Sequence, residues 1–408
     1  MTQIAAPKTN FLPTLILIIG LILLMAGLGY NRWFQPFWNQ KASSKSSVVP
    51  APQPRQGATN SAILGNGLAP IQTDREKLTQ LLMVSVVTSI NSNASGSAKT
   101  QIDDATATWL QAEKPGFIKL TSVMNRSQAN QVTQSLLKLA NDWTWPPLLT
   151  VTHFGGSQNL RGQGFETLPT MSQICSAQVA SEPALANSAV QLSQLGIAAV
   201  IGPVIDVGVN SFQGNQICDN GPEAAEAAGR YIENFSADGI FPIVAHFPGL
   251  GQAKQNPLKT IQALATTTSD LKPFKNVFEA YPNVGVLVSP VRVSERFDNL
   301  PCTQSAECLI SFATTFPDIF VLADGVNSWA ALNRTDEQLT LVESMRLSWL
   351  AGANVLVFDQ TLKLSDLTQA LNELELEMKT NSSFQAIINA NWQKSIQLRT
   401  GAKVQAGA

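Results

Sequence analysis

Residues 243–251 contain His246, one of only two histidines in the chain, where an apolar strand enters a Pro/Gly turn. Histidine titrates near neutral pH, and enzymes built as parallel barrels carry their reactive groups where strands end. Other polar side chains follow apolar runs in the same way, namely His153, Asp206, Ser289, Arg292, Asp324 and Asp359. Two carboxylates facing one mouth suffice for glycoside chemistry, because one attacks the anomeric carbon and the other handles protons.

Each of these carboxylates also has a purely structural interpretation. Asp206 and Asp359 are placed where a carboxylate commonly caps a turn. Asp324, in Leu-Ala-Asp-Gly-Val-Asn at 322–327, is equally suited to cap a following helix. The residues alone leave these alternatives open.

From Asp74 onward, short apolar runs alternate with longer amphipathic ones, which predicts strand, helix, strand throughout. The apolar runs are residues 82–87, 116–120, 148–151, 198–201, 241–244, 284–288, 319–322 and 354–358. The helical candidates between them include residues 127–141, 183–195, 222–238, 258–281 and 337–351. This order predicts an α/β fold, a (β/α)8 barrel of the TIM type over residues 74–408. An open doubly wound sheet is the alternative, but no G-x-G-x-x-G opens a helix after the first strand.

The N-terminus predicts a membrane anchor. After a short tail at 1–10, residues 11–30 carry no charge and are long enough to cross about 30 Å of hydrocarbon as a single transmembrane helix. An interfacial aromatic cluster follows, and residues 31–73 continue as a Ser/Pro/Gly-rich linker. A cleaved signal peptide is the alternative, but the run is long and no A-x-A site closes it. A tethered domain of this kind is expected on the extracytoplasmic side, although charge counts near the span do not fix the orientation.

Composition excludes one class of partner. Charged residues make up 14% of the chain, below the usual figure of about 25%, and the formal net charge is -2. No Lys/Arg block is dense enough to follow a phosphate backbone, so nucleic acid is not an expected partner.

The chain has four cysteines, Cys175, Cys218, Cys302 and Cys308. An even number in an exported domain permits disulfides, and the last two close a short loop. Unpaired thiols remain the alternative for Cys175 and Cys218. Because no C-x-x-C is present and both histidines lie far from the cysteines, neither a metal site nor a cofactor is predicted.

Three motifs, in order and spacing, resemble the N-terminal barrel of glycoside hydrolase family 3, in particular its bacterial β-N-acetylhexosaminidases. They are Pro-Val-Ile-Asp-Val-Gly at 203–208, Ala-His-Phe-Pro-Gly-Leu-Gly at 245–251 and Ala-Asp at 323–324. The resemblance spans roughly residues 78–361, with weaker similarity at Gly-Phe-Ile-Lys-Leu (116–120) and Thr-His-Phe-Gly-Gly (152–156). It implies that Asp324 occupies the nucleophile position, that His246 and more weakly His153 bind sugar, and that Asp206 belongs to the loop that supports the pocket.

The departures from the family pattern are equally informative. Thr152 stands where the family places a sugar-binding aspartate, Ala245 replaces a lysine, and Gln216 replaces an arginine. In the hexosaminidase branch a histidine in a D-x-H loop donates the proton, whereas residues 252–260 contain neither Asp nor His. Loss of a general acid removes about 10² to 10⁴ of rate.

Two hypotheses of different classes follow. The favoured one is a membrane-anchored, family 3-like domain with a degenerate hexosaminidase site, acting as a glycan-binding or scaffolding protein of the cell envelope; its expected ligand is a glycan or a peptidoglycan-derived sugar. The alternative is an active β-glycosidase with Asp324 as nucleophile and a relocated acid at Glu295 or Asp298. A third hypothesis, that the barrel only assembles with other membrane proteins, has no sequence feature for or against it, and the protein partners stay unknown.

Overall fold

The computed structural model of the chain describes residues 72–400, with internal gaps. The gaps are residues 93–97, 155–156, 159, 163, 177–180, 209–210, 215–216, 266, 294–296, 299 and 334–336. The predicted tail, the predicted anchor at 11–30 and nearly all of the predicted linker therefore lie outside the described residues. Within the described part, no helix combines the length and the apolar character needed to cross a membrane.

Eight parallel strands form a closed barrel in the order β4-β1-β11-β10-β9-β8-β7-β5, and β4 pairs with β5 to complete the circle. The predicted barrel is confirmed and the open sheet is wrong, because an open sheet has two unpaired edges. The barrel strands are β1 (Leu82–Val86), β4 (Phe117–Leu120), β5 (Leu148–Phe154), β7 (Ile197–Val204), β8 (Phe241–Phe247), β9 (Gly285–Val288), β10 (Phe320–Ala323) and β11 (Val355–Val357).

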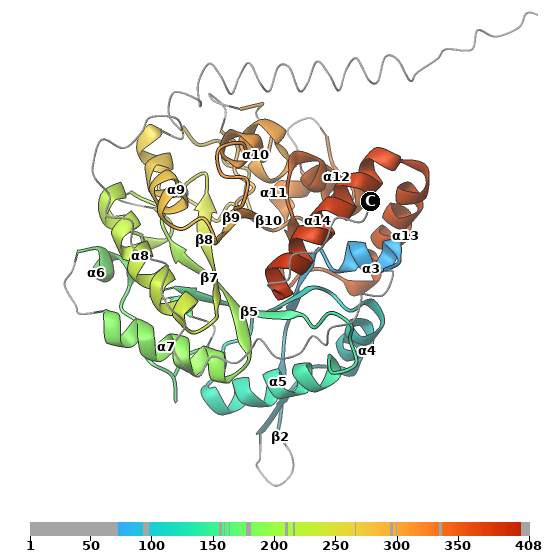
Figure 1. The fold of residues 1–408 in the computed structure, drawn as a ribbon, viewed down its shortest axis with the longest axis horizontal. Helices are drawn as coiled ribbons and strands as arrows, with labels where there is room; N and C mark the ends of the chain where they lie inside the picture. Colours follow the sequence, from blue (N-terminus) through green and yellow to red (C-terminus); the bar gives the residue numbers. More distant parts are fainter. Residues whose placement is uncertain are drawn as a thin grey trace, which may run out of the picture.

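Helices surround the barrel on its outer side, as Figure 1 shows. They are α3 (Asp74–Thr79), α4 (Asp104–Glu113), α5 (Arg126–Leu139), α6 (Met171–Cys175), α7 (Glu182–Gln194), α8 (Gly221–Ala237), α9 (Thr268–Ala280), α10 (Ala306–Ala313), α11 (Trp329–Leu332), α12 (Leu341–Ala351), α13 (Leu364–Thr380) and α14 (Ser382–Thr400). The smaller elements are an antiparallel hairpin of β2 (Ser89–Ser92) and β3 (Ala98–Gln101), the short strand β6 (Ser157–Gln158) and the 3-10 helix η3 (Cys302–Gln304).

Local capping explains where several helices begin, and it corrects two predicted helix starts. Helix α9 begins at Thr268, ten residues after the predicted start at residue 258. The Thr267 side chain accepts from the Asp270 N–H while Asp270 accepts from the Thr267 N–H, a reciprocal capping box that fixes the first turn. Thr340 and Glu343 form the same box at the start of α12, so that helix begins at Leu341 and not at 337.

The barrel interior is apolar along most of its length and polar at one end. Alternate residues of each strand point inward. The interior cluster contains buried side chains from seven of the eight barrel strands, among them Met83, Phe117, Ile201, Ile243, Leu287, Leu322 and Val357, and the partly buried Leu148 of β5 packs against it. The next inward positions toward the carboxyl ends of β4, β10 and β11 are Lys119, Asp324 and Asp359. The charged residues therefore lie at the carboxyl end of the barrel, next to its apolar interior.

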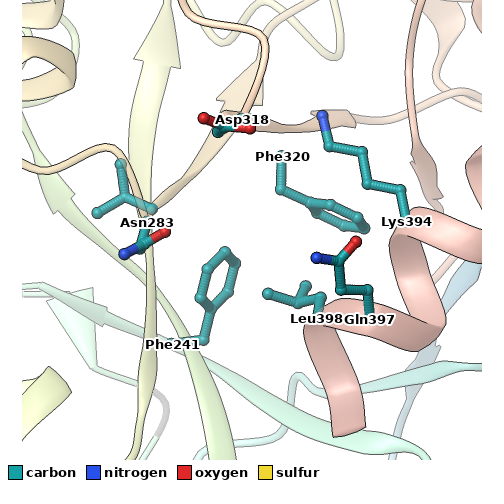
Figure 2. A pocket seen from close by; sticks show the side chains of 8 residues that line it. Phe241, Asn283, Asp318, Phe320, Lys394, Gln397 and Leu398 are labelled. Carbon is teal, nitrogen blue, oxygen red and sulfur yellow. The ribbon is translucent and has the colours of Figure 1, made fainter. Parts of the chain in front are cut away.

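The opposite end of the barrel, its base, is covered by α14. Figure 2 shows Leu398 and Gln397 of that helix facing Phe241 and Phe320 across a cavity of about 340 Å³. The two phenyl rings meet edge to face, with centroids 6.3 Å apart. The Lys394 ammonium donates to backbone carbonyl oxygens just before β10, at 2.9 and 2.8 Å.

Candidate functional site

Asp206 and His246 form a buried polar pair at the mouth of the barrel, beyond the end of β7 and near the end of β8. Oδ1 of Asp206 accepts from the backbone N–H groups of His246, at 3.2 Å, and of Leu250, at 2.9 Å. Its Oδ2 accepts from the Gln213 amide at 2.8 Å and lies 2.9 Å from His246 Nδ1. Because a carboxylate only accepts, Nδ1 carries the hydrogen. Asp206 is fully buried, so it orients the imidazole and does not contact a ligand.

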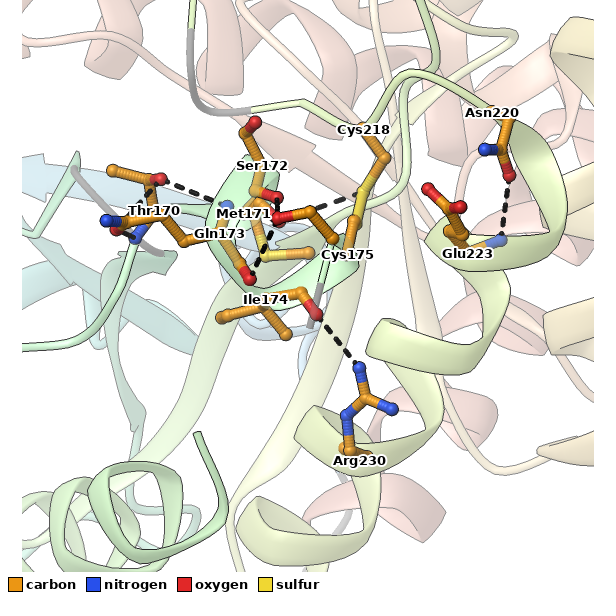
Figure 3. Close-up of a disulfide and its surroundings, with 11 residues drawn as sticks. Thr170, Met171, Ser172, Gln173, Ile174, Cys175, Cys218, Asn220, Glu223 and Arg230 are labelled. Atoms are coloured by element: carbon orange, nitrogen blue, oxygen red, sulfur yellow. Dashed lines mark hydrogen bonds between the residues drawn. A yellow bond between two sulfur atoms is a disulfide. The ribbon is translucent and has the colours of Figure 1, made fainter. Parts of the chain in front are cut away.

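A disulfide fixes the loop that carries Asp206. Cys175 and Cys218 are bonded, with their Cα atoms 5.8 Å apart, and join α6 to this loop (Figure 3). The Cys218 N–H donates to the Asp206 carbonyl at 3.4 Å, and the Arg230 guanidinium of α8 donates to the Ile174 carbonyl at 3.0 Å. The sequence left the pairing of Cys175 and Cys218 open; in the structure their disulfide stabilises the loop that carries Asp206. The second disulfide joins Cys302 to Cys308 in the segment after β9.

The last glycine of the His-Phe-Pro-Gly-Leu-Gly motif is required by a close approach of two loops. A Cβ at Gly251 would lie 1.6 Å from the carbonyl oxygen of Val207. No side chain fits there. The turn after β8 is thereby held directly against the loop after β7, which keeps His246 and Asp206 in register.

Asp324 follows β10 and is half-buried at the mouth. Its N–H donates to the Val288 carbonyl at 2.9 Å, so the residue is held at the end of the neighbouring strand β9. The N-cap of the next helix, α11, is Ser328, which shows that the helix-cap interpretation of Asp324 is wrong. Its carboxylate does not cap α11; a backbone hydrogen bond from Gly325 and the charges around it act on it instead.

Four charged groups act on one another at this mouth. Burial raises the pKa of the Asp324 carboxyl above its usual range; the charges of Lys119 and His246 oppose that rise, and Asp359 adds to it. Burial also lowers the pKa of Lys119, against the charges of Asp324 and Asp359. Their mutual influence places these groups in one electrostatic cluster.

The pKa of His246 is raised above its ordinary value. Burial disfavours the imidazolium, but the hydrogen bond and charge of Asp206, together with the charge of Asp324, outweigh burial. A positive His246 beside Asp324 favours the ionised carboxylate, the form that attacks or that accepts hydrogen bonds from sugar hydroxyls.

Asp359 is a turn cap, as its structural interpretation predicted. Its Oδ1 accepts from the Thr361 N–H at 2.7 Å and from the Asn327 amide at 2.9 Å. Asn327 Oδ1 in turn accepts from the Asp359 N–H at 2.9 Å. This reciprocal pair ties the segment after β10 to the segment after β11, and the carboxylate still adds negative charge next to Asp324.

The loop after β8, in which the resembled family carries its acid, is folded tightly here. Gln262 Oε1 accepts from the N–H groups of Lys254, at 3.2 Å, and Gln255, at 3.4 Å. The Leu258 side chain packs so closely on Gly325 that a Cβ there would lie 2.4 Å from it. The loop therefore reaches the residue next to Asp324, yet residues 252–260 bring neither a carboxyl nor an imidazole group there.

The remaining predicted site residues are His153, Glu295 and Asp298. His153 lies in β5, but its side chain is outside the described part, and Glu295 lies in a gap. Asp298 is exposed, and its charge helps burial to raise the pKa of Glu307 at the start of α10. The charges that act on Asp324 within the described residues are those of Lys119, His246 and Asp359. A role for Glu295 or Asp298 as acid stays a prediction.

Lys119 is the member of the cluster that sequence reasoning missed. It lies in β4, opposite Ser85 of β1 and Thr150 of β5. The available signal was a lysine inside an otherwise apolar strand of four residues, Phe-Ile-Lys-Leu. A buried cation in such a strand costs free energy unless carboxylates face it, and two do.

The fold and the position of this site define a parallel (β/α) barrel with its polar cluster at the carboxyl ends of the strands. The profile of the Glycosyl hydrolase family 3 N terminal domain matches residues 73–389. Since that match covers most of the chain, the protein belongs to glycoside hydrolase family 3.

Solved structures show the same fold at low sequence identity. The chain is similar to a β-N-acetylhexosaminidase from Beutenbergia cavernae, with TM-score 0.66, 18% identity, and coverage of 82% of this chain and 100% of that one. It is also similar to LpqI of M. tuberculosis, with TM-score 0.63, 18% identity, and coverage of 86% and 98%. For a family 3 β-N-acetylglucosaminidase from Paenibacillus sp. FPU-7 the values are 0.66, 17%, 83% and 64%. A comparison with curated proteins gave no match.

Proposed function

We propose that this family 3 domain binds an amino-sugar glycan of the cell envelope at its barrel mouth and is impaired as a glycosidase. The observation that carries the proposal is the loop after β8. It contacts Gly325, the neighbour of Asp324, but residues 252–260 contain no carboxyl or imidazole side chain. Without an acid, the oxygen of the leaving group departs unprotonated, which is unfavourable for an alkoxide.

The remaining groups suit binding. Asp324, Lys119 and an oriented His246 offer charged hydrogen-bond partners of both signs at the mouth, where sugar hydroxyls both donate and accept. The sugar-binding role of His246 and the nucleophile position of Asp324 come from the family resemblance. The named hexosaminidases among the similar structures make a β-linked N-acetylhexosamine the first ligand to test.

Activity on glycosides of graded leaving-group acidity tests the impairment. We expect no measurable turnover of β-1,4-linked N-acetylglucosamine oligomers, and slow release only of acidic phenols from aryl N-acetylglucosaminides, for which protonation matters least. Asp324→Asn should abolish that residual release, and Asp298→Asn should leave it unchanged. Turnover of the natural oligomers at ordinary enzymatic rates, lost in Asp324→Asn, would show a true hydrolase; its additional loss in Asp298→Asn or Glu295→Gln would identify the relocated acid.

We further propose that residues 11–30 anchor the chain in a membrane with the barrel on the extracytoplasmic side. Support comes from the uncharged run and the Ser/Pro/Gly-rich segment after it. Deleting residues 1–30 should release a folded, soluble barrel with the thermal midpoint of the full chain in detergent, as measured by fractionation and circular dichroism. Aggregation of the shortened chain would contradict the tether and indicate that this segment packs against other proteins.

A further inference from the structure

The rim of the barrel mouth carries exposed apolar side chains. Seven large apolar side chains are exposed in the described part, and four of them follow barrel strands at the mouth. These four, named here the rim set, are Val87 after β1, Val123 after β4, Phe212 after β7 and Trp329 after β10. The other three are single leucines of α5, α12 and α13. Isolated exposed leucines are ordinary, whereas a set gathered around one opening indicates a binding surface.

The two aromatic members of the rim set are exposed to 41% (Phe212) and 53% (Trp329). Both rings are carried by segments that hydrogen-bond to the loop after β8. The Phe212 N–H donates to the Ala253 carbonyl at 2.9 Å, and the Ala330 N–H, next to Trp329, donates to the Leu258 carbonyl at 3.4 Å. The loop after β8 thus links the segments that carry the two rings.

The loop after β8 is held in place by a small buried cluster beneath it. Leu250, Ala253, Leu264 and Val291 form a small buried cluster that packs the loop onto the segment after β9. The Ser211 hydroxyl, next to Phe212, donates to the Leu250 carbonyl at 3.1 Å. Rings mounted on such a framework lose little freedom when a ligand stacks on them.

A charged centre with an aromatic rim fits one class of ligand. A β-linked pyranose with equatorial substituents presents two faces of C–H groups and an edge of hydroxyls, so rings pack on its faces while charged groups take its edge. An apolar protein or lipid partner would leave Lys119, Asp324 and Asp359 facing an apolar surface, which is unfavourable. The combination therefore favours a carbohydrate over either.

We propose that Phe212 and Trp329 are stacking platforms for sugars adjoining the one held at Asp324, so that the mouth takes a β-linked oligosaccharide in preference to a monosaccharide. This inference rests on the proposed glycan binding and extends it to ligand length. It assigns each ring a separate sugar, because the two rings follow different strands, β7 and β10, and their segments hydrogen-bond to different residues of the loop, Ala253 and Leu258.

Calorimetric titration of the full chain in detergent with N-acetylglucosamine and with its β-1,4-linked tetramer tests this inference. We expect the wild type to bind the tetramer at least tenfold more tightly than the monomer, since one stacked ring is worth up to about tenfold in affinity. Trp329→Ala and Phe212→Ala should each lower tetramer affinity by about that factor and leave monomer affinity unchanged. Leu376→Ala, which shortens a still more exposed apolar side chain on α13, is the control and should change neither affinity.

The possible failures are distinguishable. Equal affinity of the wild type for monomer and tetramer, or an unchanged tetramer affinity in both ring variants, overturns the stacking platforms and leaves glycan binding intact. Absence of binding of both sugars by the wild type overturns the proposed function and this inference together. The wild type and the three variants are compared only if their thermal midpoints agree, so that a loss of affinity is not a loss of folding.

Discussion

The two ends of this barrel are built in contrasting ways. At the base, helices return to strands through short connections, such as residues 195–196 before β7 and 352–354 before β11. At the mouth, strands lead into long segments, such as residues 205–220 after β7 and 248–267 after β8. Both disulfides lie on the mouth side, in the segments that follow β5, β7 and β9. The long segments after β5, β7 and β9 are therefore cross-linked, whereas the long segment after β8 is held by hydrogen bonds and by its small buried cluster.

The same contrast runs along single strands. In β4 the inward residues are Phe117 and then Lys119, and the inward residues of β10 and the turn after it are Phe320, Leu322 and then Asp324. Moving two residues along either segment, from Phe117 to Lys119 or from Leu322 to Asp324, therefore leads from the apolar interior to the charged cluster. Stability and chemistry are therefore separated along the barrel axis, as in barrel enzymes generally.

The largest expected effect is at the base. Phe320→Ala removes a buried ring that contacts Phe241 and Phe117, and should lower the free energy of unfolding by about 3 to 5 kcal/mol in urea titrations. Affinity for the tetramer at the mouth should stay within twofold of wild type while the protein remains folded. If affinity falls together with stability, the two ends are coupled and the separation along the axis is incorrect.

A smaller effect of opposite sign is expected at the mouth. Because the pKa of Asp324 is raised, the folded state holds its proton more tightly than the unfolded chain, so this carboxyl favours folding at acid pH and less so as pH rises through the folded pKa. Lys119 and His246 oppose the shift and Asp359 reinforces it. Asp324→Asn should therefore be more stable than wild type at pH 7.

Thermal midpoints measured between about pH 4, near the unperturbed carboxyl pKa, and pH 7 check the sign. The advantage of Asp324→Asn should shrink toward pH 4, because the wild-type carboxyl takes up its proton as the pH falls through its raised pKa. Asp142→Asn, at an exposed position after α5, is the control and should show no such trend. A lower midpoint for Asp324→Asn at pH 7 would mean that Asp324 stabilises the fold, contrary to the separation of stability and chemistry along the barrel axis.

Local patterns predicted the fold well because strands and their order depend on short apolar runs. All eight predicted runs overlap barrel strands, and the positions of His246 and Asp324 at the mouth follow from them. The predicted helix at 258–281 was too long. Its first part folds as a loop, in which the Gln262 side chain accepts a hydrogen bond from the backbone N–H of Lys254, outside the predicted helix. A lysine in an otherwise apolar strand was a signal for Lys119, but its carboxylate partners and the pairing of Cys175 with Cys218 were not predictable, since both depend on which strands and loops become neighbours.

The two ends of the described chain meet at the base. Lys77 of α3 lies over the Trp392 ring of α14, 6.0 Å from its centroid, and the Ser395 hydroxyl donates to the Gln80 carbonyl at 3.5 Å. The described part of the chain therefore begins beside α14, on the side of the barrel away from Asp324. If the anchor that we propose is confirmed, attachment to the membrane and binding of a glycan would use opposite ends of the barrel.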